Sequence, residues 1–129
     1  MQLSLKDDLP FVSITLVHND RDVIIDDVLV DTGSSSTILA AHAVVAVGIE
    51  PDLNDILSVI RGVGGVETVY SRRIQAIEVG ERRLKNVEIE IGAMDYGFPI
   101  NGILGMDLLT RTGAVIDLNR LAIEFARLS

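Results

Sequence analysis

The stretch VLVDTGSSST, Val28–Thr37, places one carboxylate, Asp31, at the end of an apolar run. Gly33 and a group of small hydroxyl residues follow it directly. A strand that ends in a glycine-assisted turn projects the side chain before the glycine outward, where backbone N–H groups can orient it. Asp31 is therefore a candidate catalytic carboxylate, although Asp-Thr-Gly alone is short enough to occur by chance.

The length and composition predict a single domain over residues 1–129. The chain is 48% hydrophobic, which excludes a disordered protein. It contains no apolar run of about 18 residues, the length of a membrane helix, and no secretory signal pattern at its N-terminus. We therefore expect a soluble protein without a membrane segment, cytoplasmic by default. The absence of cysteine excludes disulfides and thiol nucleophiles.

The net charge of −8 argues against nucleic-acid binding, because such a surface repels phosphate. The arginine pairs Arg72–Arg73 and Arg82–Arg83 are isolated and form no basic patch. His18 and His42 lack the spacing of metal ligands. We therefore expect no metal, no cofactor and no nucleic-acid partner.

The hydrophobic pattern predicts a mostly β chain with two short helices, typical of a closed β-barrel or sandwich. One helix is expected over Thr37–Val47, with Ser36 or Thr37 as its N-cap, and a second before Gly113. Hairpins are expected at His18-Asn19-Asp20, at RGVGG and at Asn119-Arg120. The expected strands are Phe11–Val17, Arg21–Val30, Ile56–Ile60, Val66–Ile77 and Val87–Met94.

Acid–base chemistry at Asp31 would need a second group that no neighbour in the chain supplies. Two carboxylates placed close together share a proton, because both cannot ionise easily. A chain with one such aspartate could assemble the pair through a two-fold symmetric dimer. These residues alone do not decide whether this chain forms such a dimer.

Three motifs in order resemble the retropepsin-like aspartic proteases, the single-domain relatives of pepsin. These are VLVDTGSSST, the glycine-rich RGVGG, and Ile103-Leu104-Gly105 followed by MDLLTRTG. The resemblance implies an all-β acid-protease barrel with one lobe per chain, paired as a two-fold homodimer. It also implies an aspartic endopeptidase that binds extended peptide or protein substrates.

By this resemblance, Asp31 is the catalytic aspartate, contributed once by each protomer. Thr32 matches the threonine whose hydroxyl bonds across the dimer axis. Gly33 allows the two active-site loops to approach each other closely. Ser34 matches a position that is Ala or Ser in the family. A hydroxyl at Ser34 could donate to the ionised carboxylate, from which we expect activity at acidic pH.

The other two motifs imply a lid and a structural support. Arg61, Gly62, Val63, Gly64 and Gly65 match the flap, whose backbone would bind an extended peptide as an added strand. A plain tight turn is the alternative for this stretch.

The third motif is expected to do no chemistry. Ile103, Leu104 and Gly105 would pack beneath the active-site loop.

The chain departs from the retroviral pattern after Gly105. Those proteases carry an arginine there that helps to hold the dimer, whereas this chain has Met106 and Asp107. The dimer contacts must then come from elsewhere, and Leu3–Leu5 and Leu121–Leu128 are the two candidates. Because Asp-Thr-Gly occurs once, a two-lobed molecule like pepsin is excluded.

Two other functions remain alternatives. The chain could be a dimerisation or peptide-binding module of the same fold with little or no proteolytic activity. It could also be a monomeric β protein with a fortuitous Asp-Thr-Gly.

Overall fold

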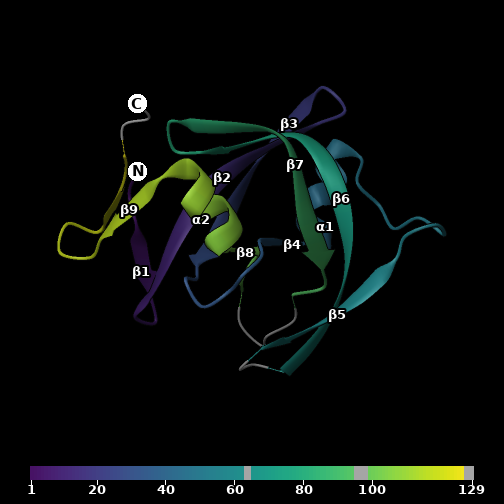
Figure 1. The fold of residues 1–129 in the computed structure, drawn as a ribbon, viewed down its shortest axis with the longest axis horizontal. Helices are drawn as coiled ribbons and strands as arrows, with labels where there is room; N and C mark the ends of the chain where they lie inside the picture. The colour runs from purple at the N-terminus through teal and green to yellow at the C-terminus, as the bar shows by residue number, and fades with distance from the viewer. Residues whose placement is uncertain (63–64, 95–98, 127–129) are drawn as a thin grey trace.

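The computed structural model describes residues 1–62, 65–94 and 99–126 (Figure 1). The chain is mostly β with two short helices, as the sequence predicts. The described helices are α1 (Ala41–Val44) and α2 (Met106–Thr112), and a 3-10 turn, η1 (Val45–Val47), continues α1. The strands are β1 (Ser4–Lys6), β2 (Leu9–His18), β3 (Arg21–Val30), β4 (Ile38–Ala40), β5 (Leu57–Gly62), β6 (Gly65–Val79), β7 (Arg82–Gly92), β8 (Gly102–Leu104), β9 (Ala114–Asp117) and β10 (Ala122–Phe125).

Eight of these strands form one sheet in the order β1-β2-β3-β8-β4-β7-β6-β5. β2 also pairs with β6. The segment Thr15–Val17 of β2 therefore has β3 on one edge and β6 on the other. The β2–β3 hairpin turns where expected, with Asn19 and Asp20 at φ 52° and 57°. Asparagine and aspartate tolerate this left-handed backbone, which two-residue hairpin turns require.

The first predicted helix begins later than expected. Ile38–Ala40 is a buried strand that lies between β7, to which it is parallel, and β8. α1 starts at Ala41, and η1, which continues it, ends at Val47 before Gly48, whose φ is 80°. The prediction of Ser36 or Thr37 as its N-cap is therefore wrong, because the pairing with two neighbouring strands overrides the helix propensity of the alanine-rich segment.

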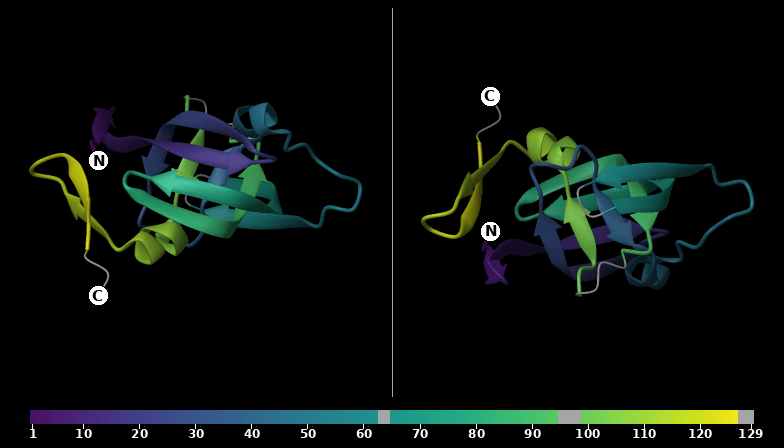
Figure 2. Two further views of the ribbon diagram at one scale, coloured as in Figure 1. Left: turned by 90° about the horizontal axis from the view of Figure 1, so that it is seen from above. Right: turned by 90° about the horizontal axis from the view of Figure 1, so that it is seen from below.

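The second helix and the last hairpin agree with the prediction. α2 ends at Gly113, whose left-handed φ of 68° lets its N–H donate to Leu109 and Thr110 carbonyls. β9 and β10 then form a separate two-stranded sheet. This hairpin projects from one end of the molecule, and the loop before β5 extends at the other end (Figure 2).

The core lies inside the large sheet and is almost entirely aliphatic. Leu16, Leu39, Ile77, Ile91 and Leu104 are fully buried in its main part. A smaller cluster around Phe11, Ile38 and Val69 adjoins it. Burial of such side chains stabilises the fold by about 2 kcal/mol each. Among the described residues, no helix is long and apolar enough to cross a membrane.

Candidate active site

Asp31 lies directly after β3, at a point fixed by the neighbouring strand. β3 and β8 are parallel and paired as Val30↔Leu104, and the Asp31 N–H donates to the Leu104 carbonyl at 3.0 Å. The half-buried Asp31 carboxylate accepts a hydrogen bond from the Gly33 N–H at 2.9 Å. Gly33 therefore orients the carboxylate through its backbone, as the turn predicted from the sequence requires.

Ser34 uses its hydroxyl differently from the expectation. The Oγ donates to the Ser36 carbonyl at 2.8 Å, and only the Ser34 backbone N–H contacts Asp31, at its carbonyl oxygen. Ser34 therefore shapes the loop, and within the single chain the argument for acidic activity from a Ser34–Asp31 side-chain bond does not hold.

The start of α2 is hydrogen-bonded to the loop that follows Asp31. The Met106 N–H donates to the Ser34 carbonyl at 2.8 Å, and the Asp107 N–H donates to the Ser35 carbonyl at 3.3 Å. Gly105 permits this approach, since a Cβ there would stand 2.3 Å from the Ser36 carbonyl oxygen. The glycine of the third motif is therefore required by close backbone contact.

Asp107 is a supporting residue whose role the sequence did not reveal. Its two carboxylate oxygens accept from the Thr37 N–H at 3.1 Å and the Thr37 hydroxyl at 2.8 Å. The Thr37 hydroxyl in turn accepts from the Gly105 N–H. An aspartate in the first turn of a helix can be recognised from the sequence as a residue that favours the helix N-terminus. The sequence does not predict that the partner of Asp107 is Thr37, 70 positions away.

The apolar pair of the third motif divides between two environments. Leu104 is fully buried in the main core beneath Asp31, as expected. Ile103 points to the other side, is half-buried and packs against the smaller cluster together with Leu29. Leu104 therefore joins the position of Asp31 to the main core, while Ile103 packs against the smaller cluster.

Thr32 is exposed and lines an apolar groove of about 510 Å³, which we call the Thr32 groove. Its other walls come from α2 and β9, and they include Met106, Leu109, Ala114, Val115 and Ile116. A second hollow of about 590 Å³ lies over β1, β2 and β3, and it contains none of the residues 31–34. Of these two hollows, the apolar Thr32 groove is the one that includes a residue of the Asp31 loop.

The glycine-rich stretch lies at the end of the β5–β6 hairpin. β5 and β6 are antiparallel, and their pairing reaches Arg61↔Val66 and Gly62↔Gly65. Val63 and Gly64 lie outside the described residues. The predicted hairpin is confirmed, and the role of Arg61, Gly62 and Gly65 in binding a peptide stays a prediction.

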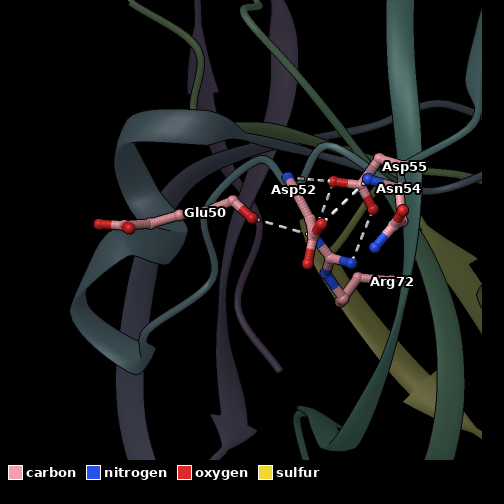
Figure 3. A network of polar contacts seen from close by, with 5 residues as sticks. All are labelled: Glu50, Asp52, Asn54, Asp55 and Arg72. Carbon is pink, nitrogen blue, oxygen red and sulfur yellow. Dashed lines mark hydrogen bonds and ion pairs between the residues drawn. The ribbon is translucent and has the colours of Figure 1, made fainter.

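The base of this hairpin is tied by a cluster around Arg72, shown in Figure 3. The guanidinium donates to both Asp55 carboxylate oxygens, at 2.8 and 3.0 Å, and to the Glu50 carbonyl at 2.9 Å. The hydrogen bonds from Arg72 to Asp55 hold the pKa of the Asp55 carboxyl below its ordinary value, helped by a hydrogen bond from the Asp52 N–H. Arg72 also lies over the ring of Tyr70, where burial raises the pKa of the hydroxyl.

A model of a protein family described as aspartyl protease matches residues 13–108. The matched range includes the Asp31 loop, the β5–β6 hairpin and the start of α2. This chain belongs to the aspartyl protease family. Within that family it carries one copy of the Asp-Thr-Gly loop rather than two.

Solved structures place this aspartyl protease family member in the retropepsin-like fold. One match is a retropepsin-like aspartic protease from Rickettsia conorii, with 23% identity and a TM-score of 0.59. The aligned region covers 91% of this chain and 81% of the Rickettsia chain. Another match is EIAV protease complexed with the inhibitor HBY-793, with 24% identity and a TM-score of 0.60. The aligned region covers 87% of this chain and 95% of the EIAV chain. No curated protein sequence matches the chain.

Proposed function

We propose that this protein is an aspartic endopeptidase that works as a two-fold homodimer with one Asp31 from each copy. The observation that carries the proposal is the placement of the single Asp-Thr-Gly loop. Its aspartate is oriented by Gly33, and its threonine lies exposed in an apolar groove. A second copy across that groove would bring a second Asp31 to the first.

The paired carboxylates would hold one water between them. One Asp31 acts as general base and takes a proton from the water as its oxygen attacks the scissile carbonyl. The other, protonated, donates to the carbonyl oxygen and stabilises the negative charge that develops there. Transfer of a proton to the leaving nitrogen then breaks the C–N bond and releases a carboxylic acid and an amine.

The β5–β6 hairpin is the candidate flap in this proposal. Its glycines permit the close backbone approach that an extended peptide needs in order to pair as an added strand. Leu29 and Ile103, the half-buried side chains next to the loop, supply apolar surface for the peptide's side chains. The substrate class supported best is therefore an extended peptide with apolar residues near the cleaved bond.

The test is cleavage of a peptide library by the wild-type protein, Asp31→Asn and Asp22→Asn across acidic and neutral pH. Asp22 is an exposed aspartate on β3, the strand that leads to Asp31, and is the matched control. We expect cleavage at acidic pH that a pepstatin-type inhibitor blocks. Asp31→Asn should lower the rate by at least about 10³-fold, as expected for loss of an essential general base, while Asp22→Asn leaves it unchanged.

Equal cleavage by Asp31→Asn and the wild-type protein would refute the proposal. A protein that dimerises and binds peptides but cleaves none at any pH would instead support the alternative function, a dimerisation or peptide-binding module.

A further inference from the structure

The side chain of Glu67 connects the β5–β6 hairpin to the end of β7. Glu67 lies on β6, two residues after Gly65 at the glycine-rich end of the hairpin. Its carboxylate accepts a hydrogen bond from the Met94 N–H at 2.9 Å, and the bond is partly buried. Hydrogen bonds from a backbone N–H to a carboxylate are stronger than those between neutral groups. The bond therefore joins the hairpin firmly to the segment that leaves β7.

The register of the sheet explains why a side chain makes this connection. The antiparallel ladder between β6 and β7 ends at the pair Val69↔Gly92. Two residues further along each strand, the same register would place Glu67 opposite Met94. The chain turns away there, since Met94 has a left-handed φ of 59°. The Glu67 carboxylate accepts the Met94 N–H at the position where the backbone ladder has stopped.

The local backbone fits this arrangement in two ways. A Cβ at Gly92 would stand 2.6 Å from Glu67 Oε1, so the glycine leaves the space that the carboxylate occupies. A left-handed φ is uncommon in a residue other than glycine and persists only where the surroundings fix it. The bond to Glu67 is one such constraint on Met94, and the burial of the Met94 side chain is another.

The Met94 side chain packs in the cluster that adjoins the proposed substrate surface. Met94 is buried in the smaller cluster together with Phe11. Leu29 and Ile103, the two side chains that would receive the peptide's apolar residues, pack against the same cluster. A shift of the turn at Met94 would therefore disturb the packing on which Leu29 and Ile103 rest.

We propose that Glu67 is a positioning residue for substrate binding, which fixes the turn at Met94 and thereby the apolar surface that receives the peptide. Its carboxylate couples the hairpin that would cover the peptide to the residues that would line its side chains. The inference rests on the proposed function for its substrate. It requires no contact between Glu67 and the peptide, because the effect passes through Met94.

Hydrogen exchange of the Met94 amide, followed by NMR, tests the contact without any substrate. Glu67→Ala should raise the exchange rate of this amide at least about tenfold, because the N–H loses a charged acceptor. Glu67→Gln keeps a side-chain oxygen of the same reach and should stay close to the wild-type rate. Glu78→Ala is the matched control, since Glu78 lies toward the other end of β6 in a surface ion pair with Arg83 at 3.5 Å.

Peptide cleavage tests the consequence for binding. Glu67→Ala should raise KM at least about fivefold for a peptide with apolar residues beside the cleaved bond and leave kcat within about twofold, since the change weakens binding and not chemistry. Glu67→Gln should keep most of the wild-type KM, and Glu78→Ala should change neither constant. A variant that is only less folded shows the opposite pattern, a lower apparent kcat at an unchanged KM.

The outcomes separate this inference from the proposed function. Cleavage with the same KM in Glu67→Ala and the wild-type protein overturns the inference and leaves the protease intact. Equal exchange of the Met94 amide in these two proteins also overturns it. A wild-type protein that binds peptides without cleaving them refutes the protease. A peptide Kd that then rises in Glu67→Ala, and not in Glu78→Ala, supports the inference.

Discussion

The active-site loop and the base of the β5–β6 hairpin are held by contacts of different kinds. The loop, residues 31–37, is bonded to Leu104, Gly105, Met106 and Asp107, mostly through backbone atoms. The hairpin base is tied mainly by the Arg72 guanidinium, and the side chains of Leu53, Ile56, Leu57 and Val59 around it are exposed. The difference separates a loop held by many bonds to a neighbouring strand and helix from a hairpin base that depends on one side chain and carries exposed apolar groups.

The largest expected effect is on the loop of residues 31–37. Gly105→Ala places a Cβ against the backbone of Ser36, which cannot move without shifting the loop. We expect a loss of about 3 kcal/mol in the free energy of unfolding, at the upper end for overpacking. Denaturant melts measure it.

Gly33→Ala is the matched control for that substitution. Its added Cβ meets only the Asp31 carboxylate oxygen, at 3.1 Å, which is the end of a side chain. This variant should keep most of its stability and lose peptide cleavage. Equal stability of Gly105→Ala and the wild-type protein would contradict the account of the loop.

The next largest effect concerns the bond between Asp107 and Thr37. Asp107→Ala leaves the N–H and hydroxyl of the buried Thr37 without their acceptor, which should cost about 2 kcal/mol. A double-mutant cycle with Thr37→Val should give a coupling energy of about 1 kcal/mol, since both changes break the same contact.

Thr112→Val provides the control for the cycle. Thr112 is also buried, but its hydroxyl bonds only to the Leu109 carbonyl within α2. Its effect should add to that of Asp107→Ala without coupling. A Thr37→Val cycle that is equally additive would show that Asp107 does not hold the loop.

At the base of the β5–β6 hairpin, the expected effect is smaller and depends on pH. Since Arg72 holds the pKa of Asp55 below its ordinary 3.8, the stabilisation is full above that value. It is lost as the pH falls through the lowered pKa of the folded state. Asp55→Asn should therefore lower Tm at neutral pH, and the difference from the wild-type protein should vanish in strong acid.

Glu88→Gln is the control for the ion pair. Glu88 lies 3.6 Å from Arg73, and both side chains are more than half exposed, so their pair should contribute almost nothing. A constant Tm difference between Asp55→Asn and wild type at every pH would refute the role of the Asp55 charge.

The smallest effect is expected at the exposed apolar side chains of β5. Val59 is 60% exposed, and Val59→Thr should change the free energy of unfolding by less than about 0.5 kcal/mol. Thermal melts at matched protein concentration measure it. A loss comparable to that of Asp107→Ala would mean that this surface is covered, and the contrast between the two regions would then fail.

Much of the local structure could be predicted because it depends on neighbouring residues. The Asn19-Asp20 turn and the helix end at Gly113 follow from residues that tolerate left-handed backbone. Ile38–Ala40 could not be predicted in this way. Its alanine-rich surroundings favour a helix, and only the partners β7 and β8 make it a strand.

The sequence alone determined the identity of the candidate catalytic residue, because a carboxylate before a glycine turn at the end of an apolar strand is a local pattern. It also showed that the chain holds one such carboxylate. Only the tertiary structure decided how the loop is held and which segments of the chain pair with β10. Asp107 meets Thr37, and the N-terminal segment meets β10, through contacts between residues 70 and more positions apart. Such contacts depend on strand order and register, which no local pattern encodes.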